Sequence, residues 1–466
     1  MRAFSAFLPR RALLQRGCRQ QARPPPTSRI LQSPSPSFIT HEQHRSMAIY
    51  AMGEGWTGAL GLENATQTIP GHHDYDEDED TVLQPVRIYD GKVRQASVGW
   101  GSTALIDEQG QLQVIGRPQD FISLLRLNRL PNMVKHWQAQ ASDDTADVTP
   151  VGSFISQTIG WATGQEDWSE AQKQSRLHEW TKISIPSETA VQKVVSSAGF
   201  SAVLGDSGTI QTFGINSRGQ CGIGKITNNV WEPQRMVGLT TNLKNLEEQE
   251  APIIDVALGL QHGYALDSQS RLFSWGKASR GQLGRETSMD QDATANTVAY
   301  DVRLVSSGMH HGTYVDLQNR VYVWGKSMGD DGQDARVPVP VQGLPEAQQI
   351  LEVSCGSHHT AVLLEDGSVY AFGIAADVPV PMMEALEVVE KGVLELPLRQ
   401  FASHQDRTTL IDNAGEVYQV HLWQNELLRE HALFTPAWVD PLLDEKLSIQ
   451  SVHRGWLHTI VVTDDP

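Results

Sequence analysis

The stretch "VSCGSHHTAVLLEDGSVYAFG", residues 353–373, decides the fold, because a close copy of it, "VSSGMHHGTYVDLQNRVYVWG", stands 48 residues earlier at 305–325. Both copies hold a short apolar run, a glycine, three residues ending in histidine, an alternating segment, a turn and a second segment that ends in an aromatic residue and glycine. Self-similarity at a fixed period of roughly 20 to 50 residues is typical of repeat architectures. We therefore expect one structural unit per repeat.

Further copies of the pattern are found on both sides of these two. Together they make seven units, anchored at Gly99, Gly199, Gly259, Gly308, Gly356, His404 and Gly455. From Gly199 onward the anchors are 60, 49, 48, 48 and 51 residues apart, a length that suits a four-stranded sheet. Seven such sheets arranged radially form a β-propeller, which leaves only short, protected edges. The sequence thus predicts an all-β, seven-bladed β-propeller over residues 47–466.

Each unit is expected to be antiparallel, because its segments alternate apolar and polar residues and are rich in Val, Tyr, Phe and Trp. A turn residue that tolerates a positive φ separates the two segments in five units: Gly110, Gly208, Asn319, Gly367 and Gly415. Ser270 stands at this place in another unit and predicts a different turn there. The aromatic residues before the closing glycines are expected to pack between neighbouring sheets: Phe213 before Gly214, Trp275 before Gly276, Trp324 before Gly325 and Phe372 before Gly373.

Two segments interrupt the repeat. The interval from Gly99 to Gly199 is 100 residues, so either residues 117–180 are an insertion or a degenerate eighth repeat lies near "SQTIGWATGQ". We favour an insertion, because the segment has apolar residues at partly helical spacing and a loop-like "DDTADVTP". The second segment, residues 71–82, is acidic and contains Asp74, Asp76, Glu77 and Asp78. It is interpreted as a solvated loop, or as a docking loop for a basic partner.

The stretch "YAMGEGWTGALG", residues 50–61, contains a G-x-G-x-x-G pattern that is also found in dinucleotide-binding turns. It aligns instead with "FSWGKASRGQLG", so that Gly53, Gly58 and Gly61 are repeat glycines, and no strand–turn–helix context surrounds it. The last unit, "GWLHTIVVTDDP", ends after one strand. We therefore expect residues 48–53 to complete the last blade and close the ring.

The first 46 residues differ in composition from the rest, with eight arginines against one acid. An Arg- and Ser-rich, acid-poor segment of this kind indicates a mitochondrial transit peptide, with a chloroplast address or a disordered basic tail as alternatives. Because this segment carries a net charge of +7 and the whole chain −18, the remaining residues carry about −25, which argues against direct DNA binding. No apolar run long enough for a transmembrane segment is present. We expect the protein in the matrix or on the matrix face of the inner membrane, where peripheral association remains open.

The pattern G-x-x-H-T…G-x-V-Y-x-W-G…G-Q-L-G, present here in "GSHHTAVLLEDGSVYAFG" and "LFSWGKASRGQLG", resembles the regulator of chromosome condensation repeat. This resemblance implies a seven-bladed propeller, and its founding member implies guanine-nucleotide exchange on a small GTPase. A mitochondrial branch of the family is similar in layout. It implies either nucleotide exchange on the dynamin-like fusion GTPase of the inner membrane, or a non-catalytic scaffold for mitochondrial ribosome assembly or ribosomal-RNA modification.

By the same resemblance, the loops beside Gly259, Gly308 and Gly356 are the expected partner contacts, with the repeat histidines His262, His311 and His359. A fourth repeat histidine is His458, whereas Ser102, Ala202 and Arg407 replace it elsewhere. An exchange factor works by competing with bound nucleotide, a task that acidic groups on one propeller face would suit. No motif for covalent catalysis is present, so we expect no enzyme active site and no cofactor. The paired histidines recur in different repeats and are not expected to bind metal.

Overall fold

The computed structural model describes residues 47–54, 59–60, 81–116, 180–186, 190–239, 251–329, 332–373, 382–405, 407–421, 433–455 and 458–464. Contacts divide the chain into two compact units, Met1–His44 and Arg45–Pro466, and every described residue belongs to the second. The expected transit peptide, the acidic residues 74–80 and the segment 117–179 lie outside the described residues. So do Gly58 and Gly61.

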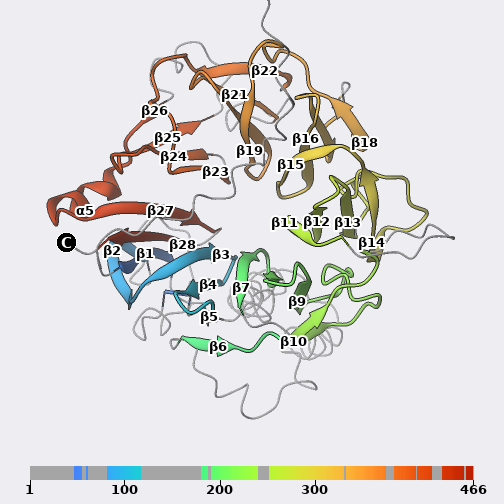
Figure 1. The fold of residues 1–466 in the computed structure, drawn as a ribbon, viewed down its shortest axis with the longest axis horizontal. Helices are drawn as coiled ribbons and strands as arrows, with labels where there is room; N and C mark the ends of the chain where they lie inside the picture. Colours follow the sequence, from blue (N-terminus) through green and yellow to red (C-terminus); the bar gives the residue numbers. More distant parts are fainter. Residues whose placement is uncertain are drawn as a thin grey trace, which may run out of the picture. The chain divides into compact units, whose positions relative to one another are not determined.

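Seven four-stranded antiparallel sheets follow one another around a central axis (Figure 1), which confirms the predicted propeller. Blade 1 contains β3 (Val93–Val98), β4 (Ser102–Asp107), β5 (Leu112–Gly116) and β6 (Thr181–Ile183). Blade 2 contains β7 (Val191–Ser196), β8 (Phe200–Gly205), β9 (Ile210–Ile215) and β10 (Asn229–Arg235). Blade 3 contains β11 (Ile253–Leu258), β12 (His262–Asp267), β13 (Leu272–Lys277) and β14 (Gln291–Ala299). Blade 4 contains β15 (Val302–Ser307), β16 (His311–Asp316), β17 (Val321–Gly325) and β18 (Ala335–Pro340).

The remaining blades follow the same plan. Blade 5 contains β19 (Ile350–Cys355), β20 (His359–Leu364), β21 (Val369–Gly373) and β22 (Met382–Val389). Blade 6 contains β23 (Gln400–His404), β24 (Arg407–Ile411), β25 (Val417–His421) and β26 (Leu433–Phe434). The short helices η2 (Ala437–Val439) and α5 (Asp440–Asp444) precede blade 7. Blade 7 contains β27 (Ser448–Arg454), β28 (His458–Asp464), β1 (Met47–Glu54) and β2 (Thr81–Asp90).

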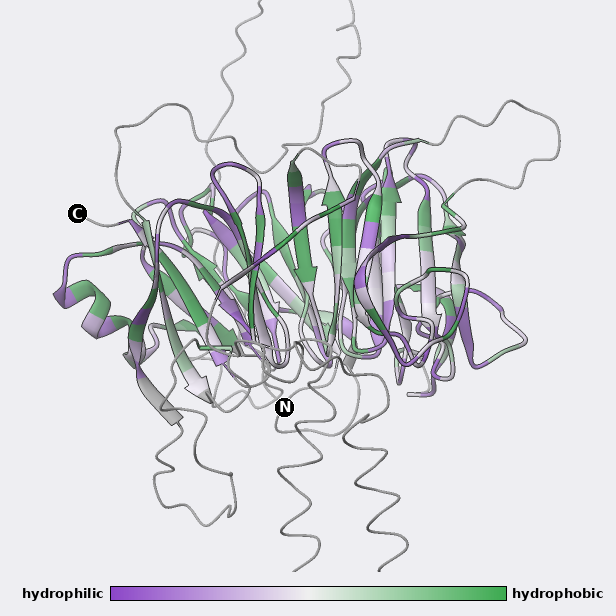
Figure 2. Cartoon of the chain, turned by 90° about the horizontal axis from the view of Figure 1, so that it is seen from below, coloured by the Kyte–Doolittle hydropathy of each residue, from purple (hydrophilic) through white to green (hydrophobic). Residues whose placement is uncertain are grey.

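The core lies between the blades. The second strand of each of blades 1 to 5 is buried along its whole length, because neighbouring sheets cover both of its faces. Figure 2 shows the apolar residues concentrated along the strands and the polar ones at the two rims. The expected aromatic packing is confirmed: Phe213, Trp275, Trp324 and Phe372 are 0 to 1% exposed. The indole Nε1 of Trp275 also donates to the Gln220 carbonyl of the preceding blade at 2.8 Å.

The two rims of the ring carry different connections. Because the strands are antiparallel, the connections from first to second strand and from third to fourth strand lie on one rim, which we call the loop face. The other two kinds of connection lie on the opposite rim. Strands β5 and β6 pair within one sheet. Residues 117–179 therefore join the third and fourth strands of blade 1, and the described part of the chain contains seven sheets.

Ring closure follows the prediction. Strand β1 pairs with β28 from Met47 opposite Asp464 to Gly53 opposite His458. The N-terminal part supplies two strands to blade 7 rather than the single one expected, because β2 pairs in turn with β1. Gly53 has a φ of 111°, close to the 98° of Gly276, and thus takes the place that the alignment assigned to it.

Two local expectations are wrong. Ser270 forms the same turn as the glycines, with a φ of 62° and an N–H donated to the Asp267 carbonyl at 3.0 Å. The alignment of Gly199 with Gly259 is displaced by two residues, because Ser197 is the residue whose N–H bonds to the carbonyl three positions later. The residue in the histidine place of blade 2 is therefore Phe200, which pairs with Gly214, and not Ala202.

Deletion of β1, residues 47–54, is expected to unfold or aggregate the protein. The deletion exposes the edge of β28 and opens the contact between blades 7 and 1. Circular dichroism and size-exclusion chromatography of the variant measure this, with a chain lacking residues 1–46 as the control that keeps its melting temperature. A stable, monomeric variant without β1 would contradict this account of ring closure.

Candidate interaction site

The repeat histidines and their glycines form the inner ends of the blades on the loop face. His262, His311, His359 and His458 are 0, 1, 3 and 3% exposed. In blades 3, 4 and 5 the imidazole folds back over the glycine three residues before it, so that a Cβ on Gly259, Gly308 or Gly356 would overlap the ring of its own histidine. The spacing G-x-x-H is thus a packing requirement.

Each of these histidines contacts a hydroxyl group of the next blade. His311 Nε2 lies 3.1 Å from Thr360 Oγ1, and His458 Nε2 lies 2.8 Å from Thr103 Oγ1 across the ring closure. The corresponding distances are 3.3 Å from His262 Nε2 to Ser307 Oγ and from His359 Nε2 to Thr408 Oγ1. The histidines therefore connect neighbouring blades.

Burial keeps three of these imidazoles neutral. It lowers the pKa of His262, His311 and His458 to about 3 in each case. Around His311 the nearby histidines, His359 first among them, lower the pKa further. A neutral imidazole can donate one hydrogen bond and accept another, as contacts with hydroxyl groups require.

The predicted partner-binding residues fall into two groups. His262, His311 and His359 lie under the loop face, and Asp74, Asp76, Glu77 and Asp78 lie outside the described residues. Their partner-binding role stays a prediction. The residues just before the three histidines, Gln261, His310 and His358, are half-buried at the loop tips, where a partner can reach them.

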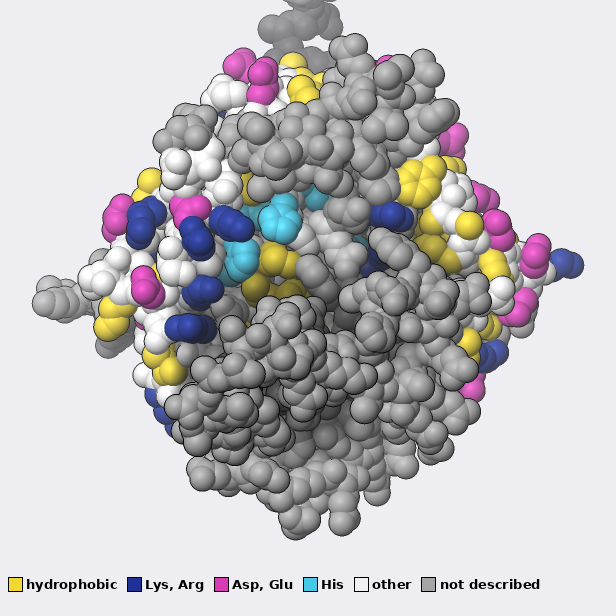
Figure 3. Space-filling model, turned by 180° about the vertical axis from the view of Figure 1, so that it is seen from behind, with side chains coloured by type: hydrophobic (Ala, Val, Ile, Leu, Met, Phe, Trp, Pro, Cys, Tyr) yellow, Lys and Arg dark blue, Asp and Glu magenta, His cyan; other side chains and the backbone are white. Residues whose placement is uncertain are grey.

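Basic side chains gather beside these tips on the loop face, as Figure 3 shows for the lysines and arginines next to the histidines. Lys277 ends β13, Lys326 follows β17, and Arg218 and Arg280 lie in the connections from third to fourth strand of blades 2 and 3. We call these four residues the cationic cluster. They belong to three successive blades, although the chain as a whole is acidic.

The charges in the cluster affect one another. Burial lowers the pKa of Lys277, and the positive charges of Arg218 and Arg280 lower it further. Burial also lowers the pKa of His310 to about 4, followed by the effects of Lys277 and Lys326. His310 is therefore neutral at physiological pH.

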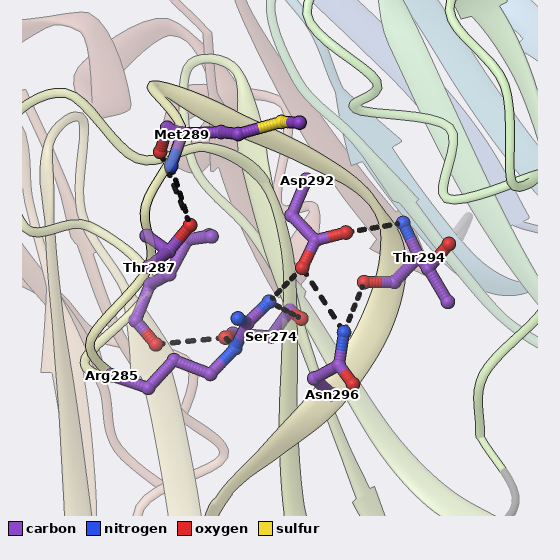
Figure 4. A network of polar contacts seen from close by, with 8 residues as sticks. Ser274, Arg285, Thr287, Met289, Asp292, Thr294 and Asn296 are labelled. Carbon is purple, nitrogen blue, oxygen red and sulfur yellow. Dashed lines mark hydrogen bonds and ion pairs between the residues drawn. The ribbon is translucent and has the colours of Figure 1, made fainter.

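A polar network holds the loop that follows the cluster in blade 3 (Figure 4). Arg285 Nη2 donates to Asp292 Oδ2 at 2.8 Å and Arg285 Nε to Ser274 Oγ at 3.1 Å. Asp292 also accepts from the side chain of Asn296 and from the backbone N–H of Thr294, each at 3.0 Å. Arg285 is thus neutralised by Asp292, and the connection between β13 and β14 is fixed by its own side chains.

The cationic cluster was not predicted from the sequence, although the repeat carries a signal for it. Lys277 and Lys326 each follow a closing glycine, and Arg218 and Arg280 each stand in the tripeptide S-R-G. Equivalent positions of successive repeats lie side by side on one rim. Comparing charges at equivalent positions, rather than along the chain, would have found the cluster.

Neither a metal site nor a membrane span is present in the part of the chain that the structure describes. Within it, no group of three or more His, Cys, Asp or Glu residues is placed to hold a metal ion. No described helix is long and apolar enough to cross a membrane.

The fold and the loop face define a seven-bladed β-propeller that offers a surface for interaction. Two family models, both described as "Regulator of chromosome condensation (RCC1) repeat", match residues 253–282 with 350–374 and residues 207–266. Residues 207–282 and 350–374 thus match RCC1 repeats, in agreement with the resemblance drawn from the motifs.

Among the similar proteins, the probable E3 ubiquitin-protein ligase HERC6 of Homo sapiens is 30% identical over 177 residues, which cover 36% of this chain and 16% of the ligase. Protein RCC2 of Homo sapiens is 27% identical over 170 residues, covering 36% of this chain and 27% of that protein. The matches thus span less than a third of either relative, and the ligase activity does not follow from them.

Among the solved structures, Prp20p from Saccharomyces cerevisiae is similar with a TM-score of 0.60 and 16% identity, covering 91% of this chain and 93% of that one. The yeast RCC1 (Prp20) structure with Kap60 gives 0.60 and 17%, covering 94% and 97%. At these identities the likeness shows the fold alone.

The buried histidines predict a loss of stability in acid. An unfolded histidine has a pKa of about 6.5 and His311 has one of about 3, so the unfolded state binds more protons between these values. Above pH 6.5 each such histidine should leave the free energy of unfolding unchanged. Below pH 6.5 it should lower that free energy by about 1.4 kcal/mol for each unit by which the pH falls.

The substitution His311→Phe tests this, because Phe200 fills the equivalent place in blade 2. In urea unfolding at pH 7, 6 and 5, the free energy of unfolding should fall less steeply with decreasing pH for the variant than for the unmodified protein. The difference between the two slopes should correspond to about one proton. Equal slopes for both proteins would contradict a neutral, buried His311.

Proposed function

We propose that this propeller is a guanine-nucleotide exchange factor for a mitochondrial GTPase, which docks on the loop face. The dynamin-like fusion GTPase of the inner membrane is the first candidate partner. The RCC1 repeats support exchange activity, and the basic, acid-poor residues 1–46 support the mitochondrial location. Prp20p, which has a similar fold, has binding properties to Gsp1p and histones, and this supports a role of such propellers in binding other proteins.

The observation that carries the proposal is the construction of the loop tips. Leu260 donates its backbone N–H to the Met309 carbonyl at 3.1 Å, and Met309 donates to the Ser357 carbonyl at 3.2 Å. The tips of blades 3 to 5 are thus bonded to one another while their side chains remain half-buried. A rigid surface with both apolar and polar groups suits binding with little loss of conformational entropy.

Exchange on this surface would be competition. A partner held on the loop face in its nucleotide-free form excludes nucleotide, and the partner then binds whichever nucleotide is abundant. In this scheme His262, His311 and His359 hold the tips in place. Gln261, His310 and His358 make the contacts.

The second candidate is a scaffold that assembles mitochondrial ribosomal or RNA-modifying proteins. It is favoured by the sign of the charge on the loop face, because the described residues gather cations there rather than the carboxylates expected for displacing phosphates. Asp334, which contacts Arg280 at 3.5 Å, is one carboxylate beside the cluster. Direct contact with RNA is not needed for this role.

Nucleotide release from the fusion GTPase separates the two functions. At micromolar concentration the full chain should accelerate release of a fluorescent GDP analogue at least about tenfold, equivalent to about 1.4 kcal/mol. The substitution Met309→Asp should abolish most of the acceleration, because it places a charge among the loop tips.

The control is Lys391→Glu, in the connection from β22 to β23 on the opposite rim. Lys391 is 70% exposed, so its substitution should leave release unchanged. No acceleration by the unmodified protein, together with cosedimentation with mitochondrial ribosomal subunits, would reject exchange in favour of the scaffold.

A further inference from the structure

We propose that the cationic cluster, Arg218, Lys277, Arg280 and Lys326, is a docking site for an acidic protein segment. This deepens the proposed function and rests on it only in that the loop face binds a protein partner. It adds that the partner presents an acidic segment. The repeat motif and the fold do not by themselves indicate this chemistry.

Geometry concentrates the four charges. Strand ends and connections at the same place in successive blades reach the same rim, so residues 218, 277 and 326, far apart in the sequence, all lie on the loop face. Lysine and arginine side chains gather beside histidines on one face of the molecule (Figure 3). The lowering of the Lys277 pKa, first by burial and then by the positive charges of Arg218 and Arg280, agrees with this proximity.

Nearby carboxylates neutralise the cluster incompletely. Within the described residues, Arg280 is paired with Asp334 at a long distance of 3.5 Å and its side chain remains 57% exposed. Arg218 donates to the side-chain oxygen of Gln291, also at 3.5 Å. Among the described acids, Asp290 is the one that acts on the pKa of Lys277. The adjacent Arg285 has a closer partner, Asp292 at 2.8 Å, so the same loop contains one closely paired and one loosely paired arginine.

The loop that carries Arg280 is ordered before any partner binds. The side chain of Gln282 accepts the backbone N–H of Arg280 at 2.7 Å, and Gln220 does the same for Arg218 at 2.8 Å. Both glutamines are 0 to 1% exposed, so the two arginines start from equivalent, fixed backbone positions. Preorganised charges bind an anion with a smaller entropic loss.

The surroundings favour an acidic protein segment over a nucleic acid. The formal net charge of −18 opposes both kinds of polyanion at long range, whereas within about a Debye length the local positive field of the cluster attracts an anionic segment. The loop tips beside the cluster present Leu260 and Met309, which suit apolar side chains between carboxylates. Phe, Tyr and Trp, which offer the largest platforms for unpaired bases, do not occur at positions 260, 261, 309 and 310 of these two tips.

The test measures binding of a fluorescein-labelled peptide of ten alternating Asp and Glu residues to the full chain by fluorescence anisotropy at low salt. Binding should weaken at least about tenfold in Lys277→Glu/Lys326→Glu and also on raising the salt concentration. The matched control is Lys391→Glu/Lys446→Glu, the same charge change on connections of the opposite rim, and it should retain binding within about twofold.

Three results would overturn the proposal: no binding of the acidic peptide, equal weakening in both double variants, or equal binding of the corresponding Asn and Gln peptide. Tighter binding of a ten-nucleotide oligouridine than of the peptide would also overturn it, in favour of RNA. Because the peptide assay contains no GTPase, failure here leaves the release assay unaffected. Acceleration of release that persists in Lys277→Glu/Lys326→Glu would separate the exchange surface from the acidic docking site.

Discussion

The contact that the rest of this structure depends on is the one between a G-x-x-H tip and the next blade. The imidazole covers its own glycine, bonds to a hydroxyl group of the neighbouring sheet and is too deeply buried to carry a charge. The residue after the glycine donates its N–H to the next tip, as Leu260 does to Met309. This histidine contact joins each of blades 3, 4, 5 and 7 to the next blade, whereas Ser102, Phe200 and Arg407 take the histidine place in blades 1, 2 and 6.

The loop tips and the tryptophans join neighbouring blades at two different distances from the axis of the ring. At the inner end the histidines contact hydroxyl groups, and farther out Trp324 donates its Nε1 to the Gln282 carbonyl of the preceding blade at 2.9 Å. Gln282 also positions Arg280 through its side chain. One buried glutamine therefore couples the packing between blades to the position of a surface charge.

Much of the fold could be predicted because its determinants are local in the repeat. The closing glycines, the aromatic residues before them and the sharing of blade 7 between both ends followed from alignment alone. The errors arose at repeat positions where a residue of another type takes the place of the expected one. Ser270 adopts a positive φ because the turn is held by Asp267, whose carboxylate accepts the N–H of Arg271. Phe200 fills the histidine place by size, which no pattern of polar residues indicates.

The candidate site was less predictable because its residues are separated in the sequence. The histidines were predicted as site residues because they are the most regular polar residues of the repeat. In this structure that regularity reflects their role in packing. The variable positions beside them, such as His310 and Lys326, are under no such constraint and are accessible from the loop face. This division explains how one propeller design can serve many partners: the buried part of the repeat must be retained for the ring to close, and the adjoining positions are free to differ between blades. A binding surface of this kind belongs to no single repeat. Its charge depends on which residues successive blades place side by side, so an acidic chain can carry a cationic docking surface at one sector of its rim.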